Sequence, residues 1–381
     1  MLLIGVAWVS LPPSVFKSRV ERLQNLLREK GIDCAMIRTL SDFKYLVGVK
    51  WLRPALLVPS DGNPKVFVAV GEEEGFLSLS KLKGVDVVTY TDGGDLMNKV
   101  VTNIKLLKAR RVGMVFGVER DAYILFYEMF KRANRDVEVV DIGPILTEMR
   151  SIKDSHEIEA ISKAAEISTM VLEKTMNFVK EGVSELELAA EAYSIAYRLG
   201  SEEPHIYINI GPHPRVHAEP LRDVVAKKNV LVTIVVGADY NGYYANASAS
   251  LFIGDSKPDE IRKAFNCAKE VYEEAVSMTK PGTRFIDVIR RLDSIYSKYG
   301  LLDKRIVGYV HGVGLQVEEY PITTIVPAHR AVEAKTGMVV AMVHSPLMLP
   351  GYGSIKIEDT FVIAENGCRK LSKAIEVVNW S

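Results

Sequence analysis

The stretch Val230–Ile253, VLVTIVVGADYNGYYANASASLFI, is the most informative part of the sequence for the fold. Its first residues, 230–236, are β-branched apart from Leu231, which favours a strand that is buried on both faces. Asn241 and Gly242 follow, and both residue types readily adopt the positive φ angles of a two-residue hairpin turn. The stretch therefore predicts two long antiparallel strands joined by a tight turn.

The position of this turn fixes which side chains face each other. It pairs Tyr240 with Tyr243 and, further along, Val235 with Ser248. Asn246 then lies on the same face as Val235, one diagonal step away. We therefore expect Val235 and Asn246 to face one buried space.

The composition is that of an ordinary globular protein. Of the 381 residues, 48% are hydrophobic and 25% are charged, and the length favours two domains. The 48 basic and 48 acidic residues cancel, which argues against a general nucleic-acid-binding protein. The cysteines Cys34, Cys267 and Cys368 are far apart, so they indicate a reducing compartment and predict neither a disulfide framework nor a zinc finger.

The first residues, MLLIGVAWVSLPP, are apolar but short, and no basic segment precedes them. This pattern is typical of neither a signal peptide nor a membrane span. We expect residues 1–13 to form a hydrophobic arm that packs on protein, and we expect a cytoplasmic protein without membrane contact.

The N-terminal half alternates short apolar strands with amphipathic helices, which predicts an α/β layer structure. Ser14 is expected to cap a first helix that ends near Gly31, and Tyr45–Gly48 is expected to be a packed strand edge. The predicted strands are Cys34–Ile37, Ala55–Val58, Val66–Val70, Val85–Tyr90, Val112–Phe116 and Val137–Val140. The further predicted helices are Glu73–Lys81, Asp95–Leu107 and Ala122–Arg132. No glycine-rich phosphate loop follows any of these strands.

The C-terminal half repeats itself at a spacing of one hundred residues. Each copy predicts a long helix, a glycine turn, a second helix and a glycine stop, followed by strands. The first copy carries Val171, Glu173, Lys180, Gly182, Ser194, Ile195 and Gly200, and the second carries Val271, Glu273, Lys280, Gly282, Ser294, Ile295 and Gly300. We therefore predict a duplicated, pseudo-two-fold domain with a ligand site in the seam between its halves.

The hairpin GADYNGYY and its flanks resemble the M24 "pita-bread" family: prolidase (Xaa-Pro dipeptidase), aminopeptidase P, methionine aminopeptidase and the metal-free creatinase. The resemblance implies an α/β (α+β) fold with a creatinase-N-like domain over residues 14–150 and a pita-bread domain over residues 151–381. In the metallopeptidases of the family, two Asp residues of this hairpin bind a pair of divalent metal ions. Here those positions hold Val235 and Asn246. Valine cannot bind a metal, and a neutral Asn is a weak replacement for a carboxylate.

Two further motifs of the family are only partly present. HGVGLQVEEYP, from His311, resembles His-Gly-x-Gly-Leu-x-x-His-Glu-x-Pro, in which the first His is a metal ligand and the second contacts substrate. Glu318 replaces that second His, which should weaken oxyanion stabilisation. The later segment Ile355–Asp359 resembles an apolar-Arg-apolar-Glu-Asp strand whose Glu bridges the metals. Glu358 is retained, Lys356 replaces the Arg, and a salt bridge between the two is one interpretation.

The position of another metal-binding Glu depends on the register of the segment GMVVAMVHSPLMLPGYG. Counting forward from Gly337 places Val343 there, whereas counting backward from Pro350-Gly351 places His344 there. A bulge could select either register. A single divalent ion (Mn, Co or Zn) on His311, His344 and Glu358 is expected only in the second case, and otherwise we expect no cofactor.

The candidate catalytic residues are therefore His217, His311, Glu318 and Glu358. His217, in PRVHAEP, resembles the family His that lies near substrate and transfers a proton in creatinase. The candidate substrate contacts are His217, Glu318, Lys356 and the hairpin residue Tyr244.

Three functions are compatible with this pattern. The favoured hypothesis is a prolidase-related protein that has lost dinuclear metallopeptidase activity and keeps its cleft for binding a small molecule or peptide. The alternatives are a metal-independent, creatinase-like hydrolase of a guanidino or amide substrate, and a weak proline-specific peptidase with one metal ion. The resemblance also implies a homodimer.

Overall fold

A computed structural model describes residues 11–117, 122–216, 219–343 and 345–372. Internal contacts divide the chain into two units, residues 1–150 and 151–381. Each unit has its own hydrophobic core. None of the described helices combines the length and apolarity needed to cross a membrane.

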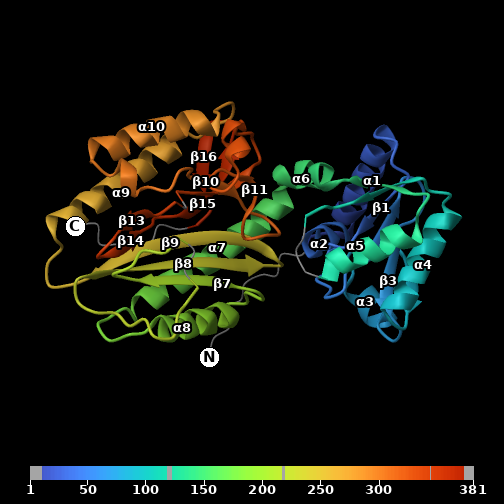
Figure 1. Ribbon diagram of the computed structural model, residues 1–381, viewed down its shortest axis with the longest axis horizontal. Helices are drawn as coiled ribbons and strands as arrows, with labels where there is room; N and C mark the ends of the chain where they lie inside the picture. The colour runs from blue at the N-terminus through green and yellow to red at the C-terminus, as the bar shows by residue number, and fades with distance from the viewer. Residues whose placement is uncertain (1–10, 118–121, 217–218, 344, 373–381) are drawn as a thin grey trace. The chain divides into compact units, whose positions relative to one another are not determined.

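The N-terminal unit is built on a six-stranded sheet in the order β4-β3-β2-β1-β5-β6 (Figure 1). The strands are β1 (Cys34–Ile37), β2 (Leu56–Pro59), β3 (Lys65–Ala69), β4 (Asp86–Tyr90), β5 (Arg111–Met114) and β6 (Glu138–Asp141). All run parallel except β2, which is antiparallel to both of its neighbours. The helices are α1 (Pro13–Glu29), α2 (Leu40–Val47), α3 (Glu73–Leu79), α4 (Gly93–Leu106), α5 (Ala122–Ala133) and α6 (Gly143–Ser151).

The core of this unit shows why its strands are so apolar. Every residue of β1 is buried, because helices cover both faces of the sheet. Helices α4 and α5 contribute to the core cluster on one face, and α1 contacts β1 and β2. The alternation of strands and helices in the sequence thus predicted the α/β layers correctly.

Two local predictions in this unit were wrong. Ser14 does not cap α1, because the helix already begins at Pro13, with Pro12 at the cap position. Proline suits the first turn because its fixed φ is helical and its missing N–H needs no partner there. Tyr45–Gly48 is not a strand edge but the last turn of α2, which Gly48 ends in a left-handed conformation with a φ of 77°.

The C-terminal unit contains the predicted duplication. Its helices are α7 (Ser155–Met176), α8 (Glu185–Arg198), α9 (Asp259–Met278) and α10 (Phe285–Lys298), with the short helices η1 (Leu302–Lys304) and η2 (Pro327–Ala331). Gly182 and Gly282 follow the first helix of each pair with φ angles of 88° and 85°. Gly200 and Gly300, also at positive φ, follow the second helix of each pair. The repeated glycines therefore mark equivalent turns of two equivalent helix pairs.

The described residues of this unit also form three sheets (Figure 1). One has the order β7-β8-β9, another the order β11-β10-β12-β15-β16, and β13 pairs with β14. Their bounds are β7 (His205–Ile210), β8 (Val230–Tyr240), β9 (Tyr243–Ile253), β10 (Val310–Gly312), β11 (Glu319–Ile322), β12 (Val339–Met342), β13 (Leu347–Leu349), β14 (Gly353–Ile355), β15 (Asp359–Ala364) and β16 (Gly367–Lys370). Helix α7 packs on β8 and β9, and α9 contacts β12, β14 and β16.

The hairpin has the register expected from its turn. Tyr240 pairs with Tyr243, and Val235 pairs with Ser248. An isolated antiparallel bridge between Ser248 and Glu358 then connects β9 to the chain just before β15. This bridge joins the two halves of the unit at the place where the predicted site residues lie.

Candidate functional site

One face of the hairpin lines the seam between the two halves. Val235 and Gly237 on β8 face Ser248 and Asn246 on β9, so the four positions form one patch. A Cβ atom at Gly237 would lie only 2.6 Å from Cγ2 of Val317. The glycine is therefore needed for the close approach of the segment that carries Val317.

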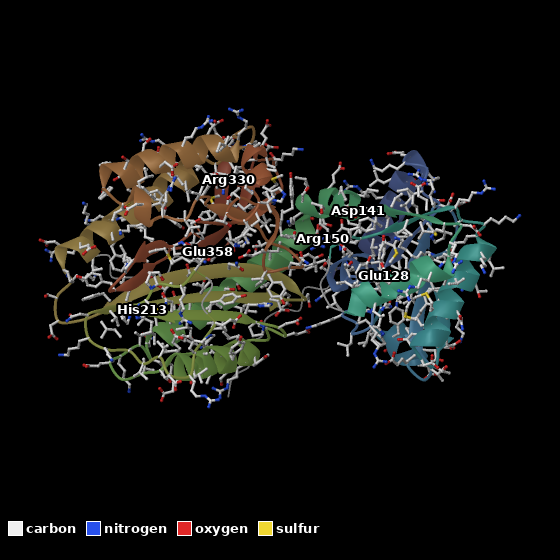
Figure 2. The ribbon with its side chains drawn as sticks, in the orientation of Figure 1. Glu128, Asp141, Arg150, His213, Arg330 and Glu358 are labelled. Atoms are coloured by element: carbon white, nitrogen blue, oxygen red, sulfur yellow. The ribbon has the colours of Figure 1, made fainter. Side chains whose placement is uncertain are left out.

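Glu358 lies at the centre of the polar cluster in this seam. Its side chain is fully buried, and Figure 2 shows it where the strands of the two halves meet. Its Oε2 atom lies 3.0 Å from Nζ of Lys356, and its Oε1 atom lies 3.3 Å from Nε2 of His311. A buried carboxylate without a partner is costly, so these two nitrogens hold the charge in place.

The segment that carries Glu358 differs from the expected continuous strand. β14 ends at Ile355 and β15 begins at Asp359, so Lys356 lies in the connection between them. Its backbone N–H donates to Oγ of Ser250 at 2.9 Å, which fixes the connection against β9. The side chain of Lys356 is 4% exposed, so its ammonium group is almost completely enclosed beside Glu358.

His311, on β10, is the second partner of Glu358. Its Nδ1 atom lies 2.9 Å from the carbonyl oxygen of Gly312, a contact in which Nδ1–H is the donor. Burial alone lowers the pKa of His311, but the contact with Glu358, the charges of Glu318 and Glu358 and the Gly312 carbonyl together raise it above its ordinary value. These contacts favour an imidazolium that donates from both ring nitrogens.

Asn246, on β9, also contacts this cluster. Its Nδ2 atom lies 3.4 Å from Nε2 of His311 and 3.4 Å from the carbonyl oxygen of Val317. Its backbone N–H donates to Oγ1 of Thr360 at 2.8 Å, and the same hydroxyl donates to the Asn246 carbonyl oxygen at 3.0 Å. Oδ1 of Asn246 and Oγ of Ser248 are buried and have no partner among the described residues. The seam thus has two polar atoms that could bond a ligand or water.

The side chain of Val343 is buried in the core of the C-terminal unit. Its φ is 59°, which is rare for a β-branched residue. The side chain packs in the core cluster with residues of α9 and α10, whereas His311 lies in the seam. The choice between Val343 and His344 for the position of the family Glu stays a prediction. His344 lies outside the described residues, and so does His217.

The other predicted contact residues lie nearer the edge of the site. Glu318 is half-buried, and its charge contributes to the raised pKa of His311. The hydroxyl of Tyr244 donates to the backbone carbonyl of Glu203 at 3.0 Å, and its ring meets that of His205 edge to face. Burial raises the pKa of Tyr244.

The sequence interpretation missed a second buried ion pair next to the site. Nζ of Lys153 lies 2.8 Å from Oε1 of Glu319, and both side chains are buried. A Cβ atom at Gly314 would lie 2.4 Å from that same Oε1 atom. The glycine of the motif therefore makes room for Glu319. The sequence interpretation also did not include Ser248 among the site residues, although the hairpin register had already placed it opposite Val235.

The described side chains do not fit a dinuclear metal centre. Two divalent ions need several carboxylates to offset four positive charges. Val235 supplies no ligand atom, Asn246 supplies no charge, and the carboxylate of Glu358 is neutralised by Lys356. Among the described residues, no group of three or more His, Cys, Asp or Glu side chains is arranged to hold a metal ion.

The two units and the duplicated C-terminal half define a protein with the architecture of the pita-bread peptidases. Residues 159–365 match the model of metallopeptidase family M24, and residues 19–152 match the creatinase/prolidase N-terminal domain. The chain therefore belongs to metallopeptidase family M24.

The similarity to known proteins covers nearly the whole chain. A Xaa-Pro dipeptidase of Pyrococcus furiosus is 27% identical over 361 residues, which cover 94% of this chain and 98% of that protein. The structure of the prolidase from Pyrococcus horikoshii OT3 superimposes with a TM-score of 0.83 at 23% identity, over 95% of this chain and 100% of that chain. The prolidase structure from Pyrococcus furiosus gives a TM-score of 0.80 at 25% identity, over 92% of this chain and 99% of that chain.

Proposed function

We propose that this chain is a prolidase-related protein that has lost dinuclear metallopeptidase activity and binds a small molecule or peptide in the seam between its two halves. The observation that carries this proposal is the ion pair of Lys356 with Glu358, whose atoms lie 3.0 Å apart. In the family, the Glu at this position bridges two metal ions. Here a lysine ammonium supplies the positive charge.

The hairpin supports the same conclusion. Val235 and Asn246 occupy the positions of the two metal-binding Asp residues, so the opposite wall of the site offers no carboxylate. Oδ1 of Asn246 and Oγ of Ser248 have no hydrogen-bond partner among the described residues. Both atoms can accept a hydrogen bond, which favours a ligand with N–H or O–H groups.

Nothing in the described residues favours the two alternative functions. The creatinase-like hydrolase depends on His217, and the mononuclear peptidase depends on His344, and both residues lie outside the part of the chain that the structure describes. We therefore propose neither function.

Metal content and dipeptide cleavage test the proposal together. After loading with manganese, cobalt or zinc and removal of free ions, we expect less than about 0.1 equivalent of bound metal, because too few charged ligands are present. We also expect no cleavage of Xaa-Pro dipeptides with any of these ions. Two bound equivalents, or cleavage that EDTA abolishes, would refute the loss of metallopeptidase activity.

A separate experiment tests binding in the seam. A peptide and metabolite library screened by thermal shift should yield a ligand that stabilises the wild type but not Asn246→Leu, because leucine removes the unpartnered Oδ1. Leu106→Asn, at an exposed position of α4, is a control that should bind like the wild type. Ligands that stabilise all three proteins equally would contradict binding at this place.

Assembly and location are also part of the proposal. We propose a homodimer in the cytoplasm, and light scattering of the purified chain tests the first point. The three cysteines form no disulfide with one another, which is compatible with a reducing compartment.

A further inference from the structure

The N-terminal unit contains a second polar cluster, far along the chain from the seam. Arg38 directly follows β1, and because Met36 of β1 contributes to the core under α4 and α5, Arg38 extends from the same face of the sheet. Its Cζ atom lies 4.4 Å from the ring centroid of Phe126 on α5, so the guanidinium group stacks on this ring.

No described residue forms an ion pair with the guanidinium group of Arg38. Its Nε and Nη1 atoms are buried and have no hydrogen-bond partner among the described residues. The hydroxyl group of Tyr90, at the end of β4, is also buried without a partner there. Burial lowers the pKa of Arg38, and the ionisable groups that act against this effect are the hydroxyls of Tyr90 and Tyr123. Because arginine stays charged in proteins, a positive charge remains here that no ion pair within the described part of the chain compensates.

The carboxylates of this region are already engaged elsewhere. Oδ1 of Asp42 lies 2.8 Å from Nη1 of Arg150, and Oδ2 accepts a hydrogen bond from Oγ1 of Thr39 at 2.6 Å. Asp141, labelled in Figure 2, accepts a hydrogen bond from the backbone N–H of Gly143 at 2.8 Å. Neither carboxylate forms an ion pair with Arg38, so none of the described residues of this unit supplies its counter-ion.

The topology of the sheet places Arg38 where α/β proteins bind ligands. The chain moves outward from β1 to β4, then returns to β5 on the other side of β1 and continues to β6. The order of the strands therefore reverses between the parallel neighbours β1 and β5. In open α/β sheets, ligands bind beyond the carboxyl ends of the strands at such a reversal. Arg38 follows the carboxyl end of β1 at this point.

We propose that Arg38 anchors a binding site for a small oxyanion, a phosphate or a carboxylate, at the carboxyl edge of the N-terminal sheet. The guanidinium group offers several N–H donors in one plane, which matches the oxygens of either group. The hydroxyl of Tyr90 offers a further donor, and the ring of Phe126 holds the guanidinium group in place. This site is independent of the seam in the C-terminal unit and of the function proposed for it.

Calorimetric titration with inorganic phosphate and with acetate tests this proposal on the full chain. The wild type should bind at least one of the two anions, and the preferred anion identifies the ligand class. Arg38→Gln should weaken that affinity about tenfold or more, because it removes a charge-assisted hydrogen bond. Tyr90→Phe should weaken it less, and Arg22→Gln, at an exposed position of α1, should leave it unchanged. Failure of both anions to bind, or equal affinity of the wild type and Arg38→Gln, would overturn the proposal.

The stability of the ligand-free variants separates a binding role from a structural role. If Arg38 is kept for a ligand, Arg38→Gln removes an uncompensated buried charge, and its melting temperature should equal or exceed that of the wild type. If Arg38 instead stabilises the fold, the variant should melt several degrees lower, with phosphate or without it. That result would also overturn the proposal.

Discussion

Replacement of Lys356 by methionine tests the central interaction of the seam. The ammonium group lies 3.0 Å from Oε2 of Glu358, and both side chains are buried. At an effective dielectric constant of about 20, two unit charges at this separation attract each other by about 5 kcal/mol. Two effects offset part of this attraction: the variant no longer has to desolvate the lysine, and Glu358 keeps its contact with His311. We therefore expect Lys356→Met to lose about 3 kcal/mol of unfolding free energy.

A double-mutant cycle shows whether this loss belongs to the ion pair. Lys356→Met combined with Glu358→Gln removes both members of the ion pair, so the double variant should be more stable than the sum of the single losses predicts, by about 2 kcal/mol. Lys298→Met is the control, because Lys298 pairs with Glu270 at 2.9 Å on the surface. Its loss should stay below about 1 kcal/mol.

Urea unfolding followed by far-ultraviolet circular dichroism measures these differences. Hydrogen exchange of peptides from residues 230–253 assigns the transition to the C-terminal unit. If Lys356→Met stays within about 1 kcal/mol of the wild type, or if the losses of the two single variants are simply additive, the ion pair does not neutralise the seam as we describe.

Three further predictions concern other parts of the chain. A Cβ atom at Gly312 would lie 2.3 Å from the backbone oxygen of Tyr320, so Gly312→Ala should lose about 3 kcal/mol of unfolding free energy in urea. Gly75 has open space around it, so Gly75→Ala is the control and should lose none. Equal stabilities of the two variants would contradict this packing. Burial raises the pKa of all three cysteine thiols to about 12. The native protein should therefore react with Ellman's reagent at pH 8 far more slowly than the urea-unfolded protein. Rapid reaction of any thiol in the native protein would refute this protection. Burial lowers the pKa of His329, whose Nδ1 atom accepts the Ile322 N–H at 2.9 Å. Below a pH of about 6.5, His329 therefore binds a proton more readily in the unfolded chain than in the folded chain, so acidification destabilises the fold. Acidification should lower the melting temperature of the wild type more than that of His329→Gln. Equal decreases in the two proteins would argue against this effect.

The hairpin and the duplication could be predicted from the sequence because their signals are local and redundant. Asn241-Gly242 fixes the turn, and a two-residue turn fixes the register of both strands. The glycines of the repeat, such as Gly182 and Gly282, occupy equivalent positive-φ positions in both halves. The same period appears in sequence and structure, so each copy supports the other.

The errors arose where short apolar segments carry no periodicity. Tyr45–Gly48 contains too few residues to distinguish a strand from the end of a helix. Val343 adopts a left-handed conformation that its residue type disfavours, so no sequence pattern predicts the backbone geometry at this residue. For Glu358, the sequence limited the partners to Lys356, His311 or a cation, but only coordinates could show that both side chains contact it.

In the ion pair of Lys356 with Glu358, the positive charge of the seam comes from the polypeptide itself. A metal ion dissociates, competes with other ions and varies with supply, whereas a lysine side chain is part of the polypeptide and is present in every copy. Its local concentration does not change with dilution or with chelators. The metal-free protein that we propose would complete its site during folding without having to acquire an ion.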